Sequence, residues 1–318
     1  MIIETNGLAK SFTRRVGRTR RQVDAVAGVD LAVKEGEIFG LLGPNGAGKT
    51  TTMRMLATVV VPDAGRATVA GHDLATEPDA VRRRIGYVTQ SGGLYHGMTP
   101  RSEIEMQARF HRFGRARARE RTDRVLDLLD LTGFADRPVR TLSGGQRRRV
   151  EIALGIVHDP AVLFLDEPST GLDPQSRAHL WDEVRRLRDG GTTVFLTTHY
   201  LDEADALCDR LVIVDGGRVV ATGSPEELKR TIGGEVVVVS LPEPDEHAVA
   251  VVTAQPFVER VDVVPAGLRL VVRDGAAAVP PLVRAFDEEL VRVGGVSVHR
   301  PGLDDVFLMQ TGRSLREG

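Results

Sequence analysis

Apolar and polar positions along most of the chain alternate between strand patterns and helix patterns. Residues 37–42 form a short, largely apolar run, and residues 162–165 form an unbroken apolar run that ends in two carboxylates. Strands that are apolar on both faces are typical of the interior of a parallel sheet. Residues 51–58 have the pattern of a helix start, and residues 99–131 have a helical, arginine-rich pattern that begins with threonine and proline. We therefore predict an α/β fold that includes a helical segment.

Beyond the glycines at 233 and 234, the pattern changes to that of a smaller domain. It predicts a strand at 235–241, a helix at 247–254, strands at 258–264 and 268–273 around a turn at 265–267, a helix at 279–293 and a strand at 296–299. This β-α-β-β-α-β order suggests a small α+β domain with a ferredoxin-like fold. Residues 233–318 contain no catalytic constellation, so a regulatory or dimer-stabilising role and a purely structural role both remain open.

Length and composition indicate a two-domain protein of the cytoplasm. The 318 residues exceed one typical core, and the 42% hydrophobic and 27% charged residues are proportions of a soluble globular protein. No apolar stretch approaches the roughly 20 residues that span a bilayer. The first residues lack the basic and apolar regions of a signal peptide. The single Cys208 excludes an intrachain disulfide, and its apolar neighbours predict core packing.

Charge gives the chain no overall attraction to nucleic acid or to anionic lipid, because the formal net charge is −2. Among 42 basic residues, only Lys10, Lys34, Lys49 and Lys229 are lysine, which we interpret as the codon bias of a GC-rich bacterial genome. The basic run at 14–21 lies between two predicted strands. A solvated hairpin loop is favoured there over a contact with lipid headgroups, because no aromatic residues are interleaved.

A phosphate-binding loop follows the first apolar strand. It fits G-x-x-x-x-G-K-[ST] and consists of Gly43, Pro44, Asn45, Gly46, Ala47, Gly48, Lys49, Thr50 and Thr51. Glycines allow backbone N–H groups to face phosphate oxygens, and the following helix N-terminus favours negative charge. Lys49 supplies an ammonium group, and Thr50 places a hydroxyl on Mg²⁺. An ordinary glycine-rich turn is the alternative, but the strand before it and the helix after it favour nucleotide binding.

Two carboxylates at the end of the second apolar strand are predicted to lie beside these phosphates. Ligands of parallel sheets bind at the carboxyl ends of the strands, where Asp166 and Glu167 stand. Asp166 is the predicted Mg²⁺ ligand, through water, because magnesium keeps several waters. Glu167 then remains free to orient or deprotonate an attacking water. The alternative is that Asp-Glu-Pro merely ends a strand.

A third motif gives the resemblance to a known family. The segments GPNGAGKTT at 43–51, LSGGQ at 142–146 and VLFLDEP at 162–168, in this order and spacing, resemble the nucleotide-binding domain of ATP-binding cassette (ABC) proteins. The match covers residues 1–232, and the segment at about 91–158 resembles the helical subdomain of the family. This resemblance implies a P-loop ABC ATPase at 1–232, which binds ATP and Mg²⁺, and an accessory domain at 233–318.

Further site residues follow from the resemblance. Gln90 matches the Q-loop glutamine, which contacts Mg²⁺ or water, and Asp173 matches the D-loop. His199 matches the histidine that contacts the γ-phosphate, and Phe12 matches the aromatic residue that stacks on adenine. Each has an alternative when it is taken alone: Gln90 as a polar strand end, His199 as a solvated or core histidine, and Phe12 as a core side chain.

The LSGGQ pentad itself is predicted to begin a helix. Ser143 fits the N-cap, and the small Gly144 and Gly145 before Gln146 permit tight entry. A capped helix N-terminus is also an anion site, so capping and nucleotide binding are compatible. The resemblance implies that the pentad closes on ATP held by the P-loop of a second copy, which gives a head-to-tail dimer with two ATP molecules.

The tail LDDVFL at 303–308 and the segment TTHYLDEA at 197–204 resemble ATP-binding subunits of the daunorubicin/doxorubicin-resistance type of ABC exporter. This resemblance implies a bacterial ATPase at the cytoplasmic face of the membrane that powers a separate permease, for export of a hydrophobic, drug-like compound. A soluble ABC ATPase that acts on ribosomes or DNA is the main alternative. Such proteins usually show two cassettes or long heptad repeats, which this chain lacks. A P-loop kinase or nucleotide switch would not need LSGGQ or the paired carboxylates.

Overall fold

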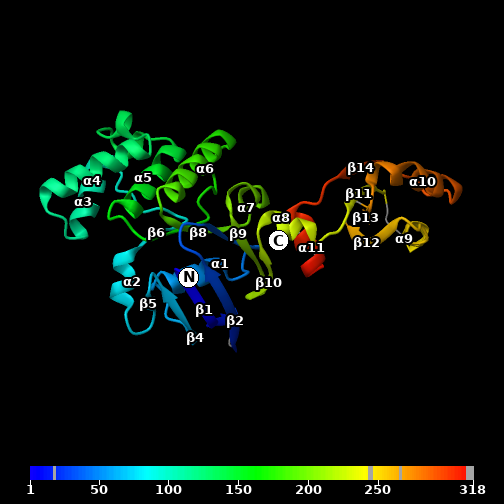
Figure 1. Ribbon diagram of the computed structural model, residues 1–318, viewed down its shortest axis with the longest axis horizontal. Helices are drawn as coiled ribbons and strands as arrows, with labels where there is room; N and C mark the ends of the chain where they lie inside the picture. The colour runs from blue at the N-terminus through cyan, green and yellow to red at the C-terminus, as the bar shows by residue number, and fades with distance from the viewer. Residues whose placement is uncertain (17–18, 243–245, 265–266, 313–318) are drawn as a thin grey trace. The chain divides into compact units, whose positions relative to one another are not determined.

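The computed structural model describes residues 1–16, 19–242, 246–264 and 267–312 and divides the chain into two compact units (Figure 1). The first unit extends from Met1 to Ser224, and the second begins at Pro225. The sequence predicted this boundary later, between residues 232 and 233. The difference arises because α8, Pro225–Arg230, packs against α11, Leu303–Thr311, from the end of the chain.

A six-stranded sheet forms the centre of the first unit, as the apolar runs predicted. Its order is β10-β9-β3-β8-β7-β6, and all neighbours are parallel except β10 and β9. The strands are β3 (Ile38–Leu42), β6 (Ile85–Val88), β7 (Val162–Asp166), β8 (Thr193–Thr198), β9 (Arg210–Asp215) and β10 (Arg218–Gly223). Every residue of β3, β7 and β8 is buried, which explains why these strands lack alternation.

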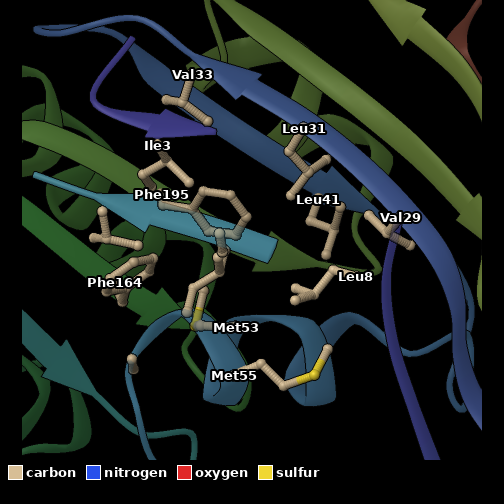
Figure 2. Close-up of a cluster of buried hydrophobic side chains, with 14 of the residues drawn as sticks. Ile3, Leu8, Val29, Leu31, Val33, Leu41, Met53, Met55, Phe164 and Phe195 are labelled. Carbon is tan, nitrogen blue, oxygen red and sulfur yellow. The ribbon is translucent and has the colours of Figure 1, made fainter. Parts of the chain in front are cut away.

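An antiparallel sheet of order β2-β1-β4-β5 completes the core of this unit. Its strands are β1 (Ile3–Val16), β2 (Thr19–Val33), β4 (Ala64–Val69) and β5 (His72–Asp73). Figure 2 shows side chains of this sheet, such as Ile3 and Leu31, close to Met53 of helix α1 and to Phe164 and Phe195 of the parallel sheet. This shared apolar core fixes α1, Lys49–Leu56, against the sheet whose strand ends carry the candidate site.

Much of the basic run at 14–21, expected to be a loop, belongs to strands β1 and β2 instead. Arg14 pairs with Arg21, and Val16 pairs with Thr19. The remaining residues of the run, Gly17 and Arg18, lie outside the described part of the chain. The hairpin of β1 and β2 is longer than the sequence suggested, because the backbone pairing continues into a segment whose sequence shows no apolar alternation.

Three helices form the helical part of the first unit: α3 (Pro100–Phe110), α4 (Arg115–Leu128) and α5 (Gly144–Ile156). Thr99 caps α3 by accepting a hydrogen bond from the Ser102 N–H group, and Pro100 is its first residue, as predicted. The single helical pattern at 99–131 proves to be two helices, separated near Arg112, whose φ is 64°. Figure 1 shows α3 and α4 beside α5, which packs on β6.

The remaining elements of the first unit connect these layers. They are α2 (Pro78–Arg84), two short 3-10 helices (Thr132–Phe134 and Val139–Thr141), α6 (Pro174–Asp189) and α7 (Leu201–Leu207). Cys208 follows α7 and is buried, as predicted; a Cβ atom added to Gly40 would lie 2.4 Å from its sulfur. Burial raises the pKa of the Cys208 thiol well above its ordinary value.

The second unit contains the predicted β-α-β-β-α-β arrangement. Its antiparallel sheet has the order β12-β13-β11-β14, and helices α9 and α10 pack on one face. The elements are β11 (Glu235–Ser240), α9 (Glu246–Thr253), β12 (Val258–Val264), β13 (Gly267–Val272), α10 (Gly275–Glu288) and β14 (Gly295–His299). This topology is that of a ferredoxin-like fold. Residues 265 and 266 of the predicted turn lie outside the described ranges.

The second helix of this unit differs from the prediction at both ends. It begins at Gly275 rather than at residue 279, because Asp274 accepts a hydrogen bond from the Ala277 N–H group and caps it. It ends at Glu288 rather than at residue 293, and Leu290 then adopts a left-handed φ of 58°. In both units, no described helix has the length and apolar character needed to cross a membrane.

Candidate active site

The phosphate-binding loop connects β3 to α1 with a tight backbone path. Gly48 precedes α1 with a φ of 100°, and a Cβ atom there would lie 2.3 Å from the Ala25 carbonyl oxygen, so only glycine fits. Lys49 is 4% exposed, and its Nζ atom donates hydrogen bonds to the carbonyl oxygens of Gly43 (2.8 Å) and Pro44 (3.0 Å). The loop therefore closes around the ammonium group.

Asp166 ends β7 directly beside this loop. Its Oδ1 atom accepts hydrogen bonds from Thr50 Oγ1 (2.9 Å) and from Thr197 Oγ1 (2.7 Å). Its Oδ2 atom is buried and makes no hydrogen bond to any residue that the structure describes. A buried carboxylate oxygen without a partner requires an explanation. An oxygen-coordinated cation supplies one, because Asp166 and the Thr50 hydroxyl are hard oxygen donors of the kind that Mg²⁺ prefers.

Glu167 lies at the centre of the site, where side chains from four segments meet. Its Oε2 atom accepts a hydrogen bond from Gln90 Nε2 (2.9 Å) and lies 3.3 Å from His199 Nδ1. Its Oε1 atom lies 3.5 Å from Lys49 Nζ, and the Thr170 hydroxyl donates a further hydrogen bond to Oε2 (3.3 Å). The structure thus brings together Gln90, Glu167, His199 and Lys49, which the sequence analysis had selected separately.

The backbone of Glu167 adopts a left-handed conformation with a φ of 45°. Such a conformation costs a non-glycine residue about 1–3 kcal/mol and persists only where the surroundings enforce it. The Glu167 N–H group points to Thr197, with the carbonyl oxygen at 3.1 Å and Oγ1 at 3.0 Å. This strained turn directs the carboxylate of a buried residue toward the phosphate-binding loop.

The site combines one ammonium group with two carboxylates, so negative charge is in excess within the chain. Burial lowers the pKa of Lys49, and the nearby Glu167 and Asp166 carboxylates oppose that shift. An ammonium group and two carboxylates in one buried site favour a ligand that combines anionic oxygens with a cation. A nucleotide triphosphate with a divalent ion has this character.

The pentad begins α5 with a reciprocal cap. Ser143 Oγ accepts a hydrogen bond from the Gln146 N–H group (3.2 Å), and Gln146 Oε1 accepts one from the Ser143 N–H group (2.9 Å). The predicted N-cap is therefore confirmed. In the described part of the chain, no hydrogen bond or ion pair connects the pentad to the phosphate-binding loop. Ser143 and Gly144 are exposed instead.

Two further predicted residues lie apart from Glu167. Asp173 caps α6 by accepting hydrogen bonds from the N–H group (2.9 Å) and hydroxyl (2.7 Å) of Ser176, which also lower its pKa. Ser176 adjoins the pentad, since a Cβ atom on Gly145 would lie 2.8 Å from its hydroxyl. Phe12 is 44% exposed on β1, which excludes a core role, and its stacking on adenine stays a prediction.

Sequence reasoning missed residues that support the carboxylates. Thr197 contacts both Asp166 and the backbone of Glu167, and Arg148 makes hydrogen bonds to the carbonyl oxygens of Asp166 and Pro168. Thr197 lies opposite Asp166 in the parallel pairing of β7 and β8. Thr197 could have been predicted from the adjacency of β7 and β8 in the sheet. No local pattern marks Arg148.

Comparison with known proteins identifies the family. The family described as "ABC transporter" matches residues 26–170, and the family described as "ATP-binding protein DrrA1-3-like, C-terminal domain" matches residues 223–311. The daunorubicin resistance ATP-binding protein DrrA3 of Streptomyces coeruleorubidus is 46% identical over 92% of both chains. This chain belongs to the ATP-binding subunits of ABC transporters. It is an ATPase, and the resemblance inferred from its three motifs is confirmed.

Other relatives of this ABC ATPase are similar over nearly their whole length. The daunorubicin/doxorubicin resistance ATP-binding protein DrrA of Streptomyces peucetius is 45% identical over 98% of this chain and 92% of its own. The Nod factor export ATP-binding protein I of Ralstonia nicotianae is 39% identical over 99% and 95%. These relatives favour a transporter subunit over an ATPase that acts on ribosomes or DNA.

Solved structures resemble most of the ATPase and support its fold. The ATP-binding cassette MJ0796, in a dimeric post-hydrolysis state bound to ADP and Pi, matches 70% of this chain and 98% of its own with a TM-score of 0.62 and 25% identity. The protein cbiO1 of Clostridium perfringens, part of an ABC transporter complex, matches 73% and 93% with a TM-score of 0.63 and 27% identity. The predicted ABC fold class is confirmed.

Removal of the Lys49 ammonium group is expected to weaken ATP binding. In Lys49→Ala, ATP affinity should fall by about 10- to 100-fold, because a hydrogen bond to a charged group contributes about 1.5–3 kcal/mol. Titration calorimetry with ATP measures this change. Lys34→Ala, which removes an exposed lysine between β2 and β3, serves as the control and should bind ATP as the wild type does. Unchanged affinity in Lys49→Ala would remove the lysine from the nucleotide site.

Proposed function

We propose that this ATPase energises a separate membrane permease that exports a hydrophobic, drug-like compound from a bacterial cell. The observation that carries the hydrolytic part is the convergence of Gln90, Lys49 and His199 on the Glu167 carboxylate. The export part is supported by the names of relatives, which include resistance to daunorubicin and doxorubicin and export of Nod factor. A subunit that works on such a permease would lie at the cytoplasmic face of the membrane.

Hydrolysis in this proposal uses Glu167 to activate water. The carboxylate accepts a proton from, or orients, a water that attacks the γ-phosphorus atom, and Gln90 holds the same water. The bond between the γ-phosphorus atom and the β–γ bridging oxygen breaks, so that ADP and phosphate leave. Lys49 neutralises the phosphate oxygens, and His199 contacts the γ-phosphate from the end of β8. Asp166, Thr50 and Gln90 would hold Mg²⁺, which supplies positive charge to the phosphates. The other residues of the loop at 43–51 bind the phosphate oxygens through their backbone N–H groups.

Two copies of the chain would form two complete sites. Each copy offers one phosphate-binding loop and one exposed pentad at the start of α5, where the first N–H groups of a helix point out of its N-terminus. A helix N-terminus of this kind binds phosphate oxygens. The Ser143 to Gln146 segment of one copy would therefore close on ATP held by the other copy, with Asp173 and its loop beside it. Adenine would stack on Phe12.

Affinity capture from bacterial membranes tests the transporter assignment. The tagged Glu167→Gln variant, loaded with ATP, should recover an integral membrane protein with several apolar spans of about 20 residues. A tagged Lys49→Ala variant, which should bind ATP weakly and form no ATP-bound dimer, is the control. The amount of membrane protein recovered with the two variants shows whether recovery depends on the nucleotide. Recovery of ribosomes or DNA, without a membrane protein, would overturn the assignment. Reduced cellular efflux of daunorubicin after deletion of the chain would support a drug-like substrate.

A further inference from the structure

One arginine on α5 holds the backbone on both sides of Glu167. Arg148, in the first turns of α5, is 6% exposed. Its Nε atom donates a hydrogen bond to the Pro168 carbonyl oxygen (2.9 Å), and its Nη2 atom donates one to the Asp166 carbonyl oxygen (3.2 Å). These two carbonyl groups directly precede and follow Glu167 in the chain. Arg148 therefore holds the carbonyl groups on both sides of the strained residue, while Thr197 accepts from its N–H group.

The same guanidinium group also holds the segment that carries Gln90. Its Nη1 atom donates hydrogen bonds to the Thr89 carbonyl oxygen (2.8 Å) and to Glu151 Oε2 (2.7 Å). Thr89 is the residue before Gln90, whose side chain donates to Glu167. Glu151 also packs against the segment that carries Gln90, because a Cβ atom on Gly92 would lie 2.0 Å from its Oε1 atom. The Arg148 side chain thus fixes the distance between the backbone segment that carries Gln90 and the one that carries Glu167.

These contacts require the shape of arginine. The guanidinium group has donors in a rigid planar fork, and here they reach three carbonyl oxygens from two separate segments and one carboxylate. A lysine ammonium is a point charge on a flexible chain and cannot hold all of these acceptors at once. Glu151 balances the buried positive charge.

We propose that Arg148 is a positioning residue for ATP hydrolysis, which enforces the left-handed backbone of Glu167 and its contact with Gln90. This inference rests on the proposed roles of Glu167 and Gln90. Because α5 begins at the pentad, Arg148 also connects the surface that closes on a partner's ATP to the hydrolytic carboxylate of its own chain. A shift of α5 would change the distance between Gln90 and Glu167.

The variant Arg148→Lys tests this role. It should lower kcat by about 10- to 100-fold, because a misplaced catalytic group loses this much activity, while ATP affinity stays within about twofold of the wild type. Steady-state ATPase rates and titration calorimetry with ATP measure the two quantities. Wild-type kcat, or loss of ATP binding together with kcat, would overturn the proposal, because the arginine would then be dispensable or merely part of the fold.

Arg121→Lys, on α4, is a matched control because Arg121 contacts the backbone at the other end of α5. Arg121 holds the carbonyl oxygens of Val157 and Ile156 and the carboxylate of Asp159, so the same kind of contacts are lost far from Glu167. Its kcat should equal that of the wild type. An equal fall in both variants would assign the effect of Arg148 to general loosening of α5 and would contradict the proposal.

A double variant separates this proposal from the proposed function. In a Glu167→Gln background, Arg148→Lys should cause no further loss of turnover, because the arginine acts through the carboxylate that is already absent. An additional 10-fold loss would overturn the positioning role. If Glu167→Gln itself retains wild-type turnover, the hydrolytic role of Glu167 fails; if only Arg148→Lys does so, the proposed function stands and this inference fails.

Discussion

Replacement of Glu167 with glutamine should slow ATP hydrolysis by about 10²- to 10³-fold and leave ATP binding intact. Glutamine keeps the size of the side chain and an oxygen that can accept the Gln90 hydrogen bond, but it cannot take a proton from water. General-base catalysis contributes rate factors of this order. The variant should accumulate an ATP-bound dimer, because the step that releases the two copies is slow. Phosphate release and light scattering in the presence of ATP and Mg²⁺ measure both effects.

The control for this variant is another buried carboxylate of the first unit. Glu183 on α6 is 1% exposed, and burial raises its pKa to about 7, with Arg149 Nη1 at 3.6 Å from its Oε1 atom. Glu183→Gln is isosteric and should hydrolyse ATP at the wild-type rate. If Glu167→Gln also turns over at the wild-type rate, Glu167 has no part in the reaction.

Ser143→Arg should abolish ATP-driven dimerisation while the monomer still binds ATP. The hydroxyl of Ser143 is exposed at the start of α5, and an arginine there both removes the cap and fills the space that a partner's phosphate would occupy. Nucleotide affinity should not change, because the phosphate-binding loop lies elsewhere in the fold. Sedimentation of the Glu167→Gln variant with and without Ser143→Arg, each with ATP, gives the measurement.

Thr99→Arg separates the loss of a helix cap from the loss of the proposed ATP contact. Thr99 caps α3 with the same reciprocal arrangement that Ser143 makes on α5. Either substitution should cost about 1 kcal/mol of stability. Thr99→Arg should nonetheless dimerise with ATP. If Ser143→Arg dimerises equally well, the pentad serves only as a helix cap and the head-to-tail arrangement is wrong.

Local sequence patterns predicted most of this fold because the decisive elements are marked by their own residues. The apolar strands at 38–42 and 162–166 and the glycines around Lys49 are local signals, and local rules describe them well. The β-α-β-β-α-β order of the second unit followed from the same rules. The structure differs from the prediction where contacts distant in sequence decide the outcome, as at α8, which packs on α11 from the end of the chain.

The sequence indicates the residues of the candidate site, but it does not indicate the residues that hold them in place. Lys49, Asp166, Glu167, Gln90 and His199 could be selected because each ends a strand or lies in a motif. Their distances depend on the order of strands in the sheet, which no single segment contains. Thr197 and Arg148 reach the site only because β8 and α5 pack beside β7. Their importance is visible only once the chain is folded.

The buried position of Cys208 makes this protein convenient for chemical labelling. It is the single cysteine of the sequence, and its raised pKa leaves little of the reactive thiolate at neutral pH. Thiol reagents should therefore react very slowly with the native chain. A cysteine introduced at an exposed position outside the pentad would then be the main target of a fluorophore or cross-linker. Opening and closing of the proposed dimer during ATP hydrolysis could thus be followed without first removing a native thiol.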